Sequence, residues 1–141
     1  MQLTQIQIRQ VQQSFGRAAT KRRFITTLFY DRLFELDPSL RPLFHNKNLE
    51  EQGCKFMQMM ALVISSLNDP VMLKQRLENM GERHLYYGVR QEHYATFGAA
   101  LLWAMEKTLG KNFTPAVREA WRAFYTFIAE TAQNGFYASA S

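Results

Sequence analysis

Cysteine is nearly absent: Cys54 is the only one among 141 residues. An internal disulfide is therefore excluded, and a reducing cytoplasm is the expected location. The first ten residues, MQLTQIQIRQ, lack the basic and apolar regions of a secretory signal. No apolar run approaches the ~20 residues that a membrane-spanning helix needs. With 7 glycines, 4 prolines and 47% apolar residues, the composition is globular, and we expect one domain over residues 1–141.

Common catalytic motifs are missing as well. The sequence has no GxSxG, HExxH or CxxC, and no glycine-rich phosphate loop or GxGxxG. It also lacks CxxCH, the signature of covalent haem attachment. These absences argue against a hydrolase or a nucleotide-binding enzyme.

Positive charge is concentrated near the N-terminus. The chain carries a net +5, and residues 1–47 hold eight basic and three acidic residues, whereas the remainder balances at nine of each. Lys21, Arg22 and Arg23 are the densest point. Three adjacent charges point in different directions around a helix. We therefore interpret them as a solvated helix start and expect neither nucleic acid nor a membrane as partner, although anionic cofactor groups remain compatible.

Apolar residues recur with the helical period of 3.6 along the whole chain, and no strict alternation predicts a strand. Thr4 and Gln7 have capping-box spacing and open a first helix to about residue 18. Further helices are expected over about residues 21–36, 49–68, 70–88, 94–109 and from 115 onward, with a short turn through 40–44. The predicted class is all-α, with six or seven helices.

Polar side chains interrupt two of these apolar stripes, Gln52 in the third long helix and His84 in the fourth. A buried amide or imidazole without a partner costs about 1–3 kcal/mol, so each must be hydrogen-bonded, face a pocket or coordinate a ligand. From periodicity alone, His84 fits a satisfied core histidine better than a metal ligand, because no second candidate ligand lies at helical spacing from it. Tyr30 likewise fits an ordinary half-buried tyrosine, bonded to backbone, better than a site residue. The methionines of residues 57–60 fit core filling or a cofactor wall.

Several segments together resemble the globin family, and within it the bacterial single-domain haemoglobins and the globin domain of flavohaemoglobins. The resemblance covers about residues 4–133. Its most specific parts are Phe29-Tyr30-Asp31-Arg32, Pro42-Leu43-Phe44, Glu82-Arg83-His84 with Tyr87-Gly88-Val89, and Ala120-Trp121 with Phe124-Tyr125. The 32 positions from Gln52 to His84 match the separation that this resemblance implies between distal and proximal haem residues.

The resemblance implies a globin fold around haem b, held non-covalently. It implies that His84 is the proximal iron ligand and that Tyr30 and Gln52 form a distal polar pair that acts on bound gas. Residues that resemble contacts of the haem are Phe44, Phe56, Met80 and Tyr94.

With two hydrogen-bond donors beside the ligand, the resemblance implies tight O₂ binding, binding of NO and CO, and oxidation of NO to nitrate. That nitric oxide dioxygenase cycle needs a separate reductase as electron donor, and a monomer or weak homo-oligomer is expected. Two alternatives stay open at this stage. One is a haem-based gas sensor that couples ligand binding to a partner, and the other is a cofactor-free helical interaction module. Whether His45 binds the iron as a sixth ligand also stays open at this stage.

Overall fold

Helices form almost all of the computed structural model, which describes residues 3–44, 48–86 and 90–140, with the backbone alone for 81–86 and 134–140. In chain order the elements are α1 Gln5–Ala19, α2 Arg22–Leu36, the 3₁₀ helix η1 Pro38–Phe44, α3 Leu49–Ser65, α4 Pro70–Tyr86, α5 Gln91–Leu109, the 3₁₀ turn η2 Gly110–Asn112 and α6 Pro115–Ala140. These described segments contain no strand, so the all-α prediction is confirmed.

Local signals set most helix ends where the sequence predicts them. At α1 the Thr4 hydroxyl accepts from the Gln7 amide, and the Gln7 side chain accepts from the Thr4 amide. The Asn48 carboxamide accepts from the first amides of α3. Gly110, with φ of 55°, ends α5 in a backbone conformation that side chains disfavour. One boundary differs from the prediction, because α3 ends at Ser65 rather than near Asn68.

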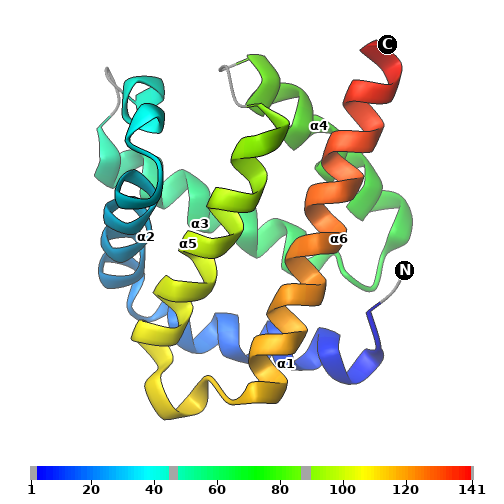
Figure 1. Cartoon of the computed structure of the whole chain (residues 1–141). Coiled ribbons are helices and arrows are strands. Elements are labelled where there is room, and N and C mark those ends of the chain that lie inside the picture. The colour runs from blue at the N-terminus through cyan, green and yellow to red at the C-terminus, as the bar shows by residue number, and fades with distance from the viewer. Residues whose placement is uncertain (1–2, 45–47, 87–89, 141) are drawn as a thin grey trace.

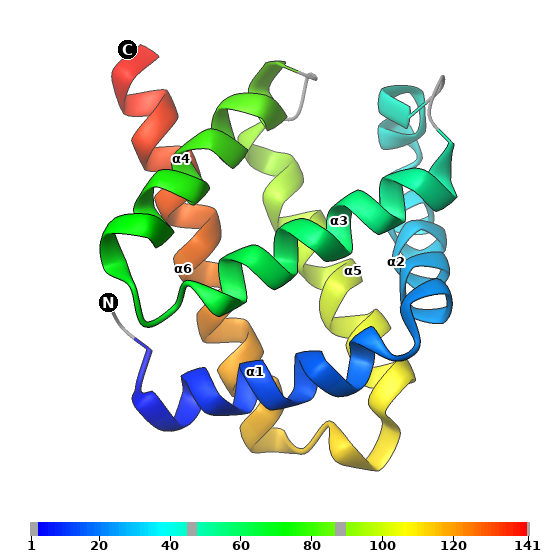
Figure 2. The same cartoon turned by 180° about the vertical axis from the view of Figure 1, so that it is seen from behind.

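The helices pack in two crossing layers. In Figure 1, α2, α5 and α6 run next to one another, with α2 against α5 and α5 against α6. Figure 2 shows α1 and α3 crossing the opposite face of these helices, and α4 packs across α6. Deep in this arrangement the Trp121 indole donates to the Ser14 hydroxyl at 2.7 Å, which joins α6 to α1.

Helix α3 has two inward sides, which the apolar periodicity of the sequence does not separate. Met57 and Ile64 are buried in the core. Gln52 and Phe56 are only half-buried, because they face a cavity rather than another helix. A single amphipathic stripe cannot separate these two environments, since both favour apolar residues.

Among the described residues, no helix is both long and apolar enough to cross a membrane.

Candidate functional site

A cavity of about 410 Å³ lies between the helices, within the size range of small-molecule sites. Its described wall comes from α2, η1, α3, α4, α5 and α6. The lining residues are Phe29, Tyr30, Leu43, Phe44, Gln52, Lys55, Phe56, Met59, Met60, Met80, Tyr94, Phe97, Leu101, Tyr125, Ile128 and Ala129. The wall is thus built of aromatic rings, thioethers and aliphatic groups, and Lys55 is the one charged residue in its described part.

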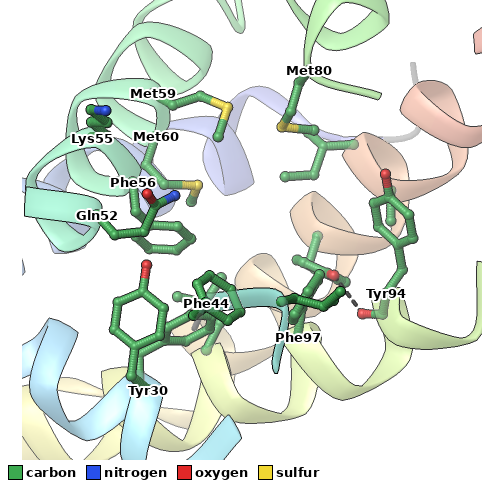
Figure 3. Close-up of a pocket in the computed structure, with 16 residues that line it drawn as sticks. Tyr30, Phe44, Gln52, Lys55, Phe56, Met59, Met60, Met80, Tyr94 and Phe97 are labelled. Atoms are coloured by element: carbon green, nitrogen blue, oxygen red, sulfur yellow. Dashed lines mark hydrogen bonds between the residues drawn. The ribbon is translucent and has the colours of Figure 1, made fainter. Parts of the chain in front are cut away.

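The ring of Tyr30 packs against other aromatic rings, whereas its hydroxyl has no hydrogen-bond partner among the described residues. The ring is 5% exposed and meets the Phe44 ring edge-on, with centroids 5.5 Å apart. In Figure 3 its hydroxyl points from α2 into the cavity, below Gln52 and Phe56. No hydrogen bond joins that hydroxyl to any described residue, and burial raises its pKa above the ordinary 10.0 of tyrosine. Tyr30 is therefore a protonated donor without a hydrogen-bond partner among the described residues.

Gln52 supplies a second polar group to the same wall. It sits in the first turn of α3, and Figure 3 shows its carboxamide above the Tyr30 hydroxyl. Its carboxamide makes no hydrogen bond to the described part of the chain. An amide can donate two hydrogen bonds and accept two. The cavity therefore presents two adjacent donors, from α2 and α3, to whatever small molecule occupies it.

The far side of the cavity is formed by α5 and α6. The Tyr125 hydroxyl donates to the backbone carbonyl of Tyr94, and the Tyr125 ring lies against Gly98, where an added Cβ would come within 2.6 Å of its Cε2 atom. Tyr94 itself is 4% exposed and lines the cavity. A glycine at residue 98 is thus required to seat the Tyr125 ring, because any side chain would displace it.

Six residues that the sequence singled out come together in this one wall: Tyr30, Phe44, Gln52, Phe56, Met80 and Tyr94. The backbone of His84 belongs to α4, but its side chain lies outside the described part of the structure. His45 and residues 87–89 also lie outside the described residues.

Phe29, Lys55 and Tyr125 are among the wall residues that the sequence did not assign to the site. Phe29 fits the core stripe of α2, so nothing local distinguishes it from ordinary filling. Lys55 follows Gln52 by three positions, a spacing that puts both on one side of a helix and could have identified it. Tyr125 contacts a residue 31 positions away, which no local pattern predicts.

Comparison with known proteins gives one consistent family. The family model for globins matches residues 27–132. Neuroglobin-2 of Oncorhynchus mykiss is 32% identical and neuroglobin of Tetraodon nigroviridis 30% identical, each over 77% of both chains. The crystal structure of a hexacoordinated haem protein from an anhydrobiotic tardigrade at pH 4 superposes with a TM-score of 0.87 at 16% identity, covering 96% of both chains. The predicted globin fold is confirmed.

Proposed function

Because the chain belongs to the globin family, we propose that it binds haem b non-covalently in the cavity and holds O₂ there with high affinity. When bound, haem supplies an iron atom that takes diatomic gases such as O₂, NO and CO. The observation that carries the proposal is a pair of polar groups, Tyr30 and Gln52, that have no hydrogen-bond partner among the described residues and lie side by side in a mostly apolar wall.

The cavity wall suits a haem. A porphyrin is a large apolar ring with two carboxylates, and the aromatic and thioether side chains of the wall suit its faces. The ammonium group of Lys55 suits a carboxylate. Phe44, Phe56, Met80 and Tyr94 are the contacts that we assign to the ring.

His84 is the iron ligand in this proposal. Met80 lines the cavity, and His84 follows it by four positions in α4, the spacing of residues on one side of a helix. A neutral imidazole is the usual protein ligand of globin iron. The assignment of His84 as iron ligand therefore rests on its spacing of four positions from Met80 and on the resemblance of the sequence to globins.

Tyr30 and Gln52 stabilise O₂ by donating hydrogen bonds to it. The raised pKa of Tyr30 keeps its hydroxyl protonated at physiological pH. If haem is bound, the hydroxyl of Tyr30 and the amide of Gln52 would donate to a gas ligand that accepts hydrogen bonds well, such as O₂, and would have far less effect on CO, which accepts them poorly. At about 1.5–3 kcal/mol for each bond to a charged acceptor, two donors slow O₂ release by roughly two to four powers of ten.

Oxidation of NO is the activity that we propose for the loaded cavity. The balanced step is NO plus O₂ plus one electron giving nitrate, so a separate reductase must supply one electron per turnover. The distal tyrosine and glutamine lead us to propose the bacterial single-domain type, whereas the relatives reported above are neuroglobins. A cytoplasmic location is proposed from the single cysteine of the sequence. Rapid formation of nitrate and ferric protein, when ferrous protein equilibrated with O₂ is mixed with NO, would support the activity, and its absence would refute it.

The visible spectrum of the purified protein supplied with haemin tests haem binding directly. We expect an intense Soret band that shifts on reduction and again with CO. His84→Ala should lose haem, and added imidazole should restore it, while Tyr30→Phe should retain haem as the matched cavity variant. Unpigmented wild-type protein would refute the proposal, and unchanged spectra of His84→Ala would refute the ligand assignment.

A further inference from the structure

Three methionines line the cavity. Figure 3 shows Met59 and Met60 extending from α3 and Met80 from α4, with their sulfur atoms toward the space between the two helices. Met60 is 5% exposed and Met80 7% exposed, and Met59 is half-buried. Bulk solvent therefore hardly reaches Met60 and Met80, whereas a small molecule inside the cavity meets both.

The sulfur of these side chains has a reactivity that other apolar groups lack. Filling the wall does not require it, since leucine has nearly the same volume as methionine. A thioether sulfur is polarizable, and its lone pair reduces peroxides with formation of methionine sulfoxide. The cavity wall therefore carries three groups that can react with a small peroxide.

Two polar groups of the same wall can hold hydrogen peroxide in place. An apolar cavity alone is a poor site for it, because a hydroxyl without a hydrogen bond is costly to remove from water. Hydrogen peroxide both donates and accepts hydrogen bonds. The Tyr30 hydroxyl and the Gln52 carboxamide face the cavity without a hydrogen-bond partner among the described residues, and together they offer donors and acceptors.

We propose that Met59, Met60 and Met80 consume hydrogen peroxide in the cavity and are thereby modified to methionine sulfoxide. In this step the sulfur lone pair forms a bond to one peroxide oxygen, and the O–O bond breaks. Sulfur loses two electrons to the peroxide. The second oxygen keeps its own hydrogen, takes the hydrogen of the transferred oxygen and leaves as water. Each thioether consumes one peroxide, so the capacity of the wall is three.

The source of the peroxide is the part of this inference that rests on the function proposed above. O₂ in the cavity becomes hydrogen peroxide when it takes up two electrons and two protons instead of reacting with NO. The separate reductase supplies these electrons, and water supplies the protons. Peroxide formed there meets the thioethers before it reaches bulk solvent.

Other methionines of the chain are matched controls. Met57 precedes Met60 by three positions on α3 and is 6% exposed, but it packs in the core and is not among the lining residues. Met105 on α5 is 1% exposed and does not line the cavity either. Met72 is 40% exposed. Exposure therefore predicts the same slow oxidation for Met57 and Met60, whereas the proposal predicts that they differ.

The first test adds a small molar excess of hydrogen peroxide to the purified full-length protein without added haemin. Peptide fragmentation by mass spectrometry then locates each sulfoxide. A core methionine is reached only when the fold opens locally, and an opening cost of about 1.4 kcal/mol already slows it about tenfold. Met60 and Met80 should thus be oxidised at least about tenfold faster than Met57 and Met105. Equal rates for Met60 and Met57 would overturn the proposal.

Two variants of conserved volume check the count of reactive sulfurs. In the same treatment, Met80→Leu should take up one oxygen atom fewer than wild type by intact mass, whereas Met105→Leu should take up as many as wild type. Undiminished uptake by Met80→Leu would overturn the role of Met80. Neither this comparison nor the first test requires haem, so both decide the reactivity even where haem binding fails.

The second test asks whether the peroxide arises inside the cavity. Ferrous, haem-loaded protein is kept under O₂ with a chemical reductant and with catalase, which removes peroxide from solution but is too large to enter the cavity. Sulfoxide should accumulate at Met60 and Met80 while Met72 stays unmodified, because catalase protects only the exposed side chain. Protection of Met60 and Met80 together with Met72 would overturn the internal source.

Discussion

Tyr30→Phe removes one hydroxyl from the cavity and nothing else. The Tyr30 ring keeps its contacts with Phe29, Phe34 and Phe44, since all three involve the ring alone. The hydroxyl has no hydrogen-bond partner among the described residues, so the haem-free fold loses no bond. The whole effect of the substitution should therefore fall on the ligand.

The size of that effect follows from the bond that O₂ loses. A hydrogen bond to a charged acceptor contributes about 1.5–3 kcal/mol, and every 1.4 kcal/mol is about a factor of ten. We therefore expect O₂ to dissociate about 10- to 150-fold faster from Tyr30→Phe, with a far smaller change for CO. Removing an unpartnered buried hydroxyl should leave the free energy of unfolding unchanged or raise it by up to about 1 kcal/mol.

The assay is flash photolysis or ligand replacement for the two gases, combined with chemical unfolding of the same samples. Tyr125→Phe is the matched control, because its hydroxyl is already bonded to the Tyr94 carbonyl. It should change O₂ dissociation far less but lower the free energy of unfolding by about 0.5–1.5 kcal/mol. Equal rate changes for O₂ and CO in Tyr30→Phe would refute the role of this hydroxyl.

Three further predictions concern stability. Gly98→Ala should destabilise by about 1–3 kcal/mol in chemical unfolding, because its Cβ would lie 2.6 Å from the Tyr125 ring. Gly16→Ala, with nothing within 4 Å, should instead stabilise by about 0.5–1 kcal/mol, and the same sign for both would contradict the clash. Ser14→Ala leaves the buried Trp121 indole N–H without its acceptor and should cost about 1–3 kcal/mol; an unchanged unfolding midpoint would exclude that bond as a stabilising contact. Burial is the main reason why the pKa of Tyr125 lies above its ordinary value of 10.0. The folded state therefore holds the hydroxyl proton more strongly than the unfolded state. The resulting stability is complete below the ordinary pKa and is lost as the pH rises above it. Unfolding free energy measured against pH should fall above about pH 10, and less steeply in Tyr125→Phe than in wild type.

Helix positions were predictable because their signals are local. The capping box of Thr4 and Gln7 and the prolines that open α4 and α6 act within one turn, so the sequence alone places those ends. The C-terminal end of α3 shows where local signals are not enough to place a helix boundary. Its end shifts from Asn68 to Ser65, where the Arg76 guanidinium of α4 bonds the Leu62 carbonyl of the last turn.

The site was predictable where a residue type breaks a pattern. Tyr30 and Gln52 stand out because a polar group on an apolar stripe needs a reason, and the structure places both in one cavity wall. Phe29 does not stand out, since an aromatic residue on a core stripe is ordinary. Only its stack with Phe56 on another helix distinguishes it.

The sequence by itself determined the helices, their order and the polar residues that core packing cannot account for, because periodicity and capping depend on neighbours within a few positions. Tertiary structure alone decided which side of α3 faces the cavity and how closely α2 and α3 approach at Gly53. It also decided that Tyr125 reaches the Tyr94 carbonyl. These features depend on contacts between residues far apart in the chain, and such contacts exist only once the helices have packed.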